Sequence, residues 1–191
     1  MKRIRVSLLL LCLFLLPALA AGEEPVNALN LYWGRMTSNE WEELFKPGEI
    51  EMADSSLVAV ALARRVGGLG DRLSFEVEGQ VARHYGGERY WEFVGLGGGR
   101  WEPFWWDRYV DTSLFYGLGV SYTTRRPQVE IEMDGDTERL MAYWVLELAF
   151  SLPQHPQLAL IGRLHHRSGA YGLFADKGGS TAPAIGLKYR F

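Results

Sequence analysis

The feature that most constrains this chain is a recurrent two-residue alternation of apolar and polar side chains. Successive side chains of a β-strand point to opposite faces, so the alternation predicts strands with one apolar and one polar face. No later apolar run approaches the ~20 residues that a membrane-spanning helix needs. The alternation occurs in eight segments, which are residues 29–35, 57–65, 73–82, 90–97, 113–122, 142–151, 158–168 and 184–191.

The connections between these segments alternate in length. Glycine- and proline-rich turns at 66–71 and 153–156 are short, whereas the connections 37–55, 123–138 and 169–180 are long. Short turns at one end and long loops at the other are typical of an outer-membrane barrel. An eight-stranded barrel is just wide enough to be filled by side chains, which excludes a diffusion pore. We expect the charges facing the lumen to pair as Glu76, Glu78, Glu92 and Glu147 opposite Arg163, Arg167, Lys188 and Arg190.

A soluble eight-stranded carrier, of the lipocalin kind, is the main alternative fold. It would turn its apolar faces inward and its polar faces to water. Here the apolar faces carry Trp, Tyr and Leu, and further aromatic residues gather near strand ends, as in the girdles of membrane barrels. The chain also ends in Phe191, which resembles the assembly signal of such barrels. We therefore predict an all-β fold, an eight-stranded antiparallel transmembrane β-barrel of the outer-membrane type.

The N-terminus has the layout of a secretory signal peptide. A basic start, an apolar run at 8–16 and small residues at 18–20 predict cleavage near Ala20, leaving residues 21–191 as the barrel. A membrane anchor is the alternative, but the apolar run is short for it. We expect export to the bacterial outer membrane. The formal charge of −3 argues against a nucleic-acid partner, and a single cysteine, Cys12, excludes a disulfide scaffold.

The segment 158–168 carries the most chemical information. Its leucines share one face with His166 and Ser168, whereas Arg163 and Arg167 share the other. The leucine face should meet lipid, at the cell-surface end of the strand. There an imidazole could activate the serine hydroxyl as a nucleophile. The alternative is that both are polar residues at an interface. We predict no metal site, because His165 and His166 point to opposite faces and His84 and His155 lie at opposite ends of other strands. We also expect no cofactor.

The C-terminal residues 163–174, 178–181 and 186–191 resemble the end of the lipid A 3-O-deacylase, or acyloxyacyl-hydrolase-like, family of outer-membrane barrels. The resemblance implies removal of an ester-linked acyl chain from lipid A by a Ser–His–acid triad on the lipid-facing wall. Its His-x-Ser motif matches His166 and Ser168. The family's orienting glutamate matches Ser180 or Thr181, of which strand parity favours Thr181. Asp176, in the preceding loop, is a carboxylate that could swing in to this position. The family's oxyanion-binding asparagine matches Gly169.

Two hypotheses follow from these residues. The first is an ester hydrolase acting on lipid A or a related outer-leaflet lipid, with Ser168 as nucleophile, His166 as base, and Thr181 or Asp176 as orienting residue. The second is a non-catalytic barrel of the same family, whose acidic loops 40–54 and 130–138 would contact a surface partner. The partner in the first case is lipopolysaccharide itself, and the oligomeric state stays open.

Overall fold

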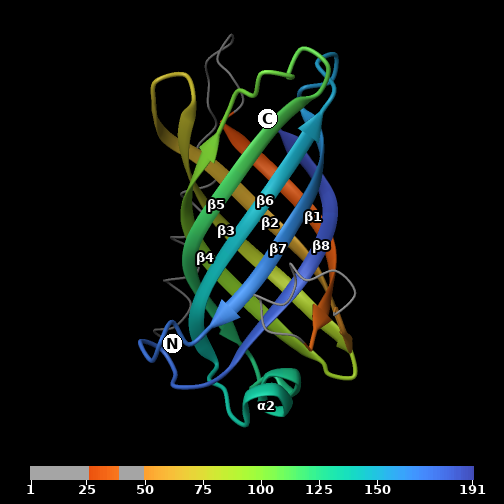
Figure 1. Cartoon of the computed structure of the whole chain (residues 1–191), viewed down its shortest axis with the longest axis vertical. Coiled ribbons are helices and arrows are strands. Elements are labelled where there is room, and N and C mark those ends of the chain that lie inside the picture. The colour runs from red at the N-terminus through yellow and green to blue at the C-terminus, as the bar shows by residue number, and fades with distance from the viewer. Residues whose placement is uncertain (1–25, 39–49) are drawn as a thin grey trace, which may run out of the picture.

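The computed structural model of the chain describes residues 26–38 and 50–191, and the expected signal peptide lies outside them. Within these residues the chain forms one closed barrel of eight strands with one short helix (Figure 1). The elements are β1 (Asn27–Thr37), β2 (Met52–Leu69), β3 (Leu73–Gly86), β4 (Tyr90–Trp101), β5 (Asp111–Thr123), α2 (Gln128–Asp134), β6 (Leu140–Ser151), β7 (Leu158–Ser168) and β8 (Gly179–Arg190).

Every strand pairs antiparallel with the next one in sequence, and β1 closes the barrel against β8. The closing pair runs from Ala28 opposite Arg190 to Gly34 opposite Ala184. Closure leaves no open sheet edge, which a membrane span requires because lipid offers no hydrogen bonds. All eight predicted strands are therefore confirmed. Several extend beyond the alternating segments, since backbone pairing continues past the apolar pattern toward the loops.

The burial of side chains separates the two fold alternatives. Along β7, Ala159, Ile161 and Arg163 are buried, whereas Leu158 and Leu160 are each 50% exposed. A soluble barrel would show the reverse, so the lipocalin-like alternative is wrong and the outer-membrane type is confirmed. The same outward band of large apolar side chains continues on the other strands, with Leu31, Trp33, Val58, Val60, Phe75, Val77, Trp91, Phe93, Tyr116, Leu118, Leu148, Phe150, Ile185, Leu187 and Tyr189.

The lumen is filled by side chains and paired charges. Glu147 lies 2.9 Å from Arg100 and 3.1 Å from Arg163, and it also contacts Lys188. Glu78 lies 2.7 Å from Arg163. Charges in such a confined space must be paired, because an isolated buried charge costs several kcal/mol. The expected pairing is present in part, since Glu78 and Glu147 pair with Arg163 and Lys188 as predicted. The other predicted partners differ, because Glu76 pairs with Arg100, Arg167 with Glu130, Arg190 with Glu102, and Glu92 with His84 and His165.

The connections at the α2 end include the long ones at 124–139 and 169–178 (Figure 1). The alternation of lengths has exceptions, because the β3–β4 turn at 87–89 is short and the β4–β5 connection at 102–110 is longer. Within residues 26–38 and 50–191, no helix is long and apolar enough to span a membrane.

Candidate active site

His166 and Ser168 lie on the outer face of β7, near its end at the long loops. In the barrel register, His166 stands opposite Trp144 of β6 on one side and Thr181 of β8 on the other. Opposed residues of neighbouring strands have Cβ atoms about 4.5–5.5 Å apart, so their side chains contact. Strand parity and register together place these residues on one patch of the outer wall.

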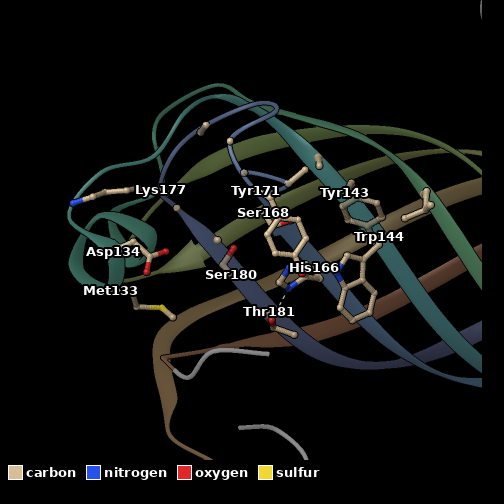
Figure 2. A pocket seen from close by; sticks show the side chains of 18 of the residues that line it. Met133, Asp134, Tyr143, Trp144, His166, Ser168, Tyr171, Lys177, Ser180 and Thr181 are labelled. Atoms are coloured by element: carbon tan, nitrogen blue, oxygen red, sulfur yellow. Dashed lines mark hydrogen bonds between the residues drawn. The ribbon is translucent and has the colours of Figure 1, made fainter. Parts of the chain in front are cut away.

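The His166 ring is held by two contacts. Its Nδ1 lies 2.8 Å from Thr181 Oγ1, the hydrogen bond drawn in Figure 2. The ring of Trp144 packs against it with centroids 4.7 Å apart, which leaves His166 only 5% exposed. When Nδ1–H donates to the Thr181 hydroxyl, the lone pair of the imidazole resides on Nε2. Within the described part of the chain, Nε2 has no hydrogen-bond partner, so it is available as a base.

Ser168 follows two residues after His166 on the same face and is half-buried. No hydrogen bond joins its hydroxyl to His166 among residues 26–38 and 50–191. Residues two apart on a strand are about 7 Å apart at Cα, which rotation of both side chains can bridge. Catalytic hydrogen bonds are often long before substrate binds, so this arrangement is compatible with a Ser–His pair.

These side chains line a pocket of about 1080 Å³ (Figure 2). One wall is the apolar outer surface of β5, β6 and β7, and another is the loop 169–178. Met133 and Asp134 of α2 border it further out. The pocket is therefore apolar toward the barrel wall and polar toward the loops. The apolar wall contributes Tyr116, Leu118, Trp144, Leu146 and Leu164.

Gly169 is fixed by the loop that follows it. The backbone N–H groups of Phe174 and Ala175 both donate to its carbonyl oxygen, at 3.0 and 3.4 Å. A Cβ atom at position 169 would collide with the carbonyl oxygen of Ala175. An asparagine, which the family that the C-terminal residues resemble has at this position, therefore does not fit here unless the loop moves.

The same loop has an unusual backbone. Ala170 and Tyr171 have φ of 50° and 55°, and Gly172 has φ of 88°. Left-handed residues other than glycine cost roughly 1–3 kcal/mol and gather at functional sites. The backbone N–H groups of these three residues make no hydrogen bond to another described residue. They follow Ser168 by two to four residues, and backbone donors of this kind can bind an oxyanion.

The four predicted site residues, His166, Ser168, Thr181 and Asp176, line one pocket. Asp176 does not act on the imidazole, because it is exposed and makes no hydrogen bond to His166 in the described part of the chain. Thr181, which strand parity favoured as the orienting residue, is the group that hydrogen-bonds to Nδ1 of His166. Sequence reasoning did not find Trp144, because its contact with His166 depends on the register between β6 and β7.

Comparisons with known proteins support the fold and nothing beyond it. No family model matches the sequence, and no curated protein matches it. The crystal structure of the outer membrane enzyme PagL matches with a TM-score of 0.57 and 11% identity, covering 86% of this chain and 99% of that chain.

Two further structures match less well. A de novo designed transmembrane β-barrel gives a TM-score of 0.49 at 12% identity, covering 90% of this chain and 100% of that chain. Ail of Yersinia pestis gives 0.45 at 12% identity, covering 88% of this chain and 100% of that chain.

Proposed function

We propose that this barrel is an outer-membrane ester hydrolase that removes an ester-linked acyl chain from lipid A or a related outer-leaflet lipid. The observation that carries the proposal is the imidazole of His166, fixed by Thr181 through Nδ1 and placed beside Ser168 in a pocket on the apolar outer wall. The C-terminal resemblance to lipid A 3-O-deacylases and the fold likeness to an outer membrane enzyme agree with it.

The mechanism assigns one task to each side chain. Nε2 of His166 takes the proton of Ser168 as Oγ attacks the ester carbonyl. The tetrahedral oxyanion is bound by backbone N–H groups at the start of the loop 169–178. His166 then protonates the leaving alkoxide, and water releases the acyl group from Ser168 by the same steps in reverse. Thr181 keeps the ring in the required tautomer and orientation.

The proposed orientation puts this chemistry at the right depth. With the signal peptide removed and the N-terminus in the periplasm, β7 runs outward and ends near the cell surface. The apolar wall below His166 would hold an acyl chain in continuity with the bilayer. The polar loops above would meet the headgroup, so the ester of an outer-leaflet lipid would lie between them.

A neutral hydroxyl at position 181 limits the rate. A carboxylate in this role both orients the ring and stabilises the imidazolium, and its replacement by a neutral group costs about 10⁴ in kcat in serine proteases. Thr181 supplies orientation only. We therefore expect slow turnover, measured over hours of incubation.

The test is incubation of the refolded barrel with lipopolysaccharide in detergent, followed by mass measurement of lipid A. The wild type should remove one hydroxyacyl chain. Ser168→Ala and His166→Asn should each reduce product by about 10³ or more. His155→Asn, in the β6–β7 turn, is the matched histidine control and should match the wild type. Absence of product with wild type, or equal product with Ser168→Ala, would refute the proposal.

A non-catalytic barrel is the second candidate, favoured by the hydroxyl that stands where the resembling family has a carboxylate. Of its expected contact surfaces, residues 39–49 lie outside the described residues. In the second expected surface, the loop 130–138, Glu130 is buried, and Asp136 and Glu138 pair with Arg126 at 2.9 and 2.6 Å. That loop is thus less open to a partner than its sequence suggests. Covalent labelling of Ser168 by a fluorophosphonate ester would refute this candidate.

A further inference from the structure

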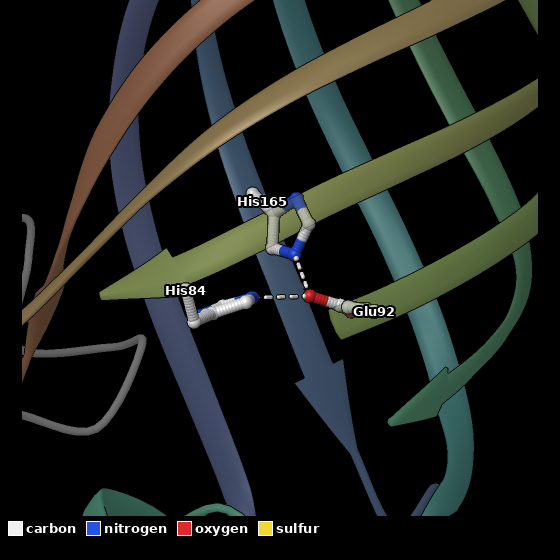
Figure 3. Close-up of side chains that lie close together, drawn as sticks. All are labelled: His84, Glu92 and His165. Atoms are coloured by element: carbon white, nitrogen blue, oxygen red, sulfur yellow. Dashed lines mark hydrogen bonds and ion pairs between the residues drawn. The ribbon is translucent and has the colours of Figure 1, made fainter. Parts of the chain in front are cut away.

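Three lumen-facing side chains, two from neighbouring strands and one from across the barrel, meet near the α2 end. They are His84 of β3, Glu92 of β4 and His165 of β7 (Figure 3). Glu92 Oε2 lies 2.7 Å from His84 Nε2 and 3.0 Å from His165 Nε2. All three residues are buried, and one carboxylate oxygen stands between two imidazole nitrogens.

Surrounding groups fix each member of this cluster. Ser121 Oγ donates to the other carboxylate oxygen, Glu92 Oε1, at 2.5 Å. The Tyr143 hydroxyl lies 2.9 Å from His165 Nδ1. The ring of His84 stacks on Tyr90 with centroids 4.1 Å apart. Partners that orient a carboxylate and the far nitrogen of an imidazole are the arrangement that supports metal ligands.

The two short contacts to Glu92 Oε2 indicate what a cation would replace. For Glu92 Oε2 to accept from both rings, His84 and His165 must each carry a proton on Nε2. Two protons then point at one oxygen in a buried space. His84 Nδ1 has no hydrogen-bond partner within the described residues, so the proton of that ring can move there. A cation at the centre would free both Nε2 lone pairs to bind it.

We propose that His84, Glu92 and His165 bind a divalent transition-metal ion of the Zn²⁺ class. Two imidazole nitrogens and one carboxylate oxygen with a fourth position open are a ligand set that Zn²⁺ takes in proteins. The three ligand atoms already lie within 4.8 Å of one another. Ligands at 2.0–2.2 Å from zinc are roughly 3.3 Å apart, so small movements of the rings make the site.

The nearby positive charges do not compete for Glu92. Arg167 Nε lies 3.0 Å from Glu130, and Arg163 is paired with Glu78 and Glu147. Glu92 Oε2 is therefore left to the two imidazoles, while Oε1 accepts from Ser121. A bound ion would link β3, β4 and β7 across the lumen, on the opposite side of the wall from His166. The site is independent of the proposed hydrolase activity.

The experiment measures metal in the folded barrel. The protein is refolded in detergent with Co²⁺ or Zn²⁺, or metal-free with the ion added later, then desalted against a weak chelator and analysed by elemental mass spectrometry. Refolding with metal loads the site even if the closed barrel admits ions slowly. We expect one ion per chain, and with Co²⁺ the visible absorption of an ion that has fewer than six ligands.

The variants separate this site from adventitious binding. Loss of a second-shell partner costs about 10–100-fold in metal affinity, so His84→Asn, Glu92→Gln and His165→Asn should each cost more than 100-fold. His155→Asn and His166→Asn should bind like the wild type. Heat-modifiable gel migration confirms folding of each protein. Substoichiometric metal in the wild type under both loading conditions, or equal binding in the three cluster variants, would overturn the proposal.

Discussion

At the scale of single residues, Thr181 decides how well His166 can act. Its hydroxyl is the one group that holds Nδ1 in the described part of the chain. Thr181→Val keeps the shape and removes this bond, and a neutral hydrogen bond contributes about 1 kcal/mol. We expect kcat for ester hydrolysis to fall by about fivefold with KM little changed, because the ring loses orientation while the pocket keeps its walls.

The converse substitution, Thr181→Asp, sharpens this prediction. A carboxylate beside Nδ1 adds stabilisation of the imidazolium, so kcat should rise above that of the wild type by tenfold or more. Steady-state kinetics on a soluble ester that enters the pocket would measure both variants. If Thr181→Val and Thr181→Asp lower kcat and raise KM alike, Thr181 is only a structural residue of the wall.

Part of this site could be predicted from the sequence, for a simple geometric reason. Strand parity alone assigns His166, Ser168 and Thr181 to outward faces, because side chains alternate with period two. Contact between His166 and Thr181 requires the register of β7 against β8, which parity does not give. The conformation of Ala170 and Tyr171 was also beyond prediction, since neither residue type signals a left-handed backbone.

At the scale of elements, α2 closes the barrel mouth through one buried side chain. The Glu130 carboxylate lies 3.0 Å from Arg167 Nε, accepts from Ser180 Oγ at 2.7 Å and contacts Thr137. Glu130→Ala would leave the buried guanidinium without its carboxylate, which costs about 3 kcal/mol or more. We expect the loop 124–139 to open more often, and limited proteolysis there to speed up by about 100-fold.

Two further variants of α2 test whether the Glu130 side chain is what keeps the loop 124–139 closed. Burial raises the pKa of the Glu130 carboxyl even though Arg167 lies beside it, so the site tolerates a neutral side chain of the same shape. Glu130→Gln should therefore be cleaved more slowly than Glu130→Ala. Glu132→Ala removes an exposed carboxylate from the same helix and should match the wild type. Equal cleavage of the Glu130→Ala and Glu132→Ala proteins would contradict the closure by Glu130.

At the scale of the whole molecule, the strands follow from local pattern, whereas the lumen does not. Alternation is a property of neighbouring residues, so it indicates all eight strands and which faces they turn outward. The cluster of His84, Glu92 and His165 joins strands on opposite sides of the barrel. The sequence alone predicted no metal site, because His165 and His166 lie on opposite faces and His84 and His155 lie at opposite ends of other strands. Which residues face each other across a lumen depends on closure and stagger of the full barrel.

The direction in which the barrel crosses the membrane links its fold to its substrate. The chain has one cysteine, Cys12, which lies in the expected signal peptide. A cysteine introduced into the barrel is therefore the one thiol that a maleimide can label once the signal peptide is removed. Lys177→Cys lies in the loop 169–178, Gln154→Cys in the β6–β7 turn, and Leu187→Cys on the apolar wall. In intact Gram-negative cells, a membrane-impermeant maleimide should label Lys177→Cys alone. Gln154→Cys should react after permeabilisation, and Leu187→Cys only after unfolding.

The opposite labelling pattern would have a direct chemical consequence. If Gln154→Cys reacted from outside and Lys177→Cys did not, the pocket around His166 would face the inner leaflet. Lipid A belongs to the outer leaflet, so it could not reach Ser168, and the substrate would have to be a phospholipid ester. Because β7 and its loop carry His166 and Ser168 together, a single orientation fixes the leaflet for the whole site.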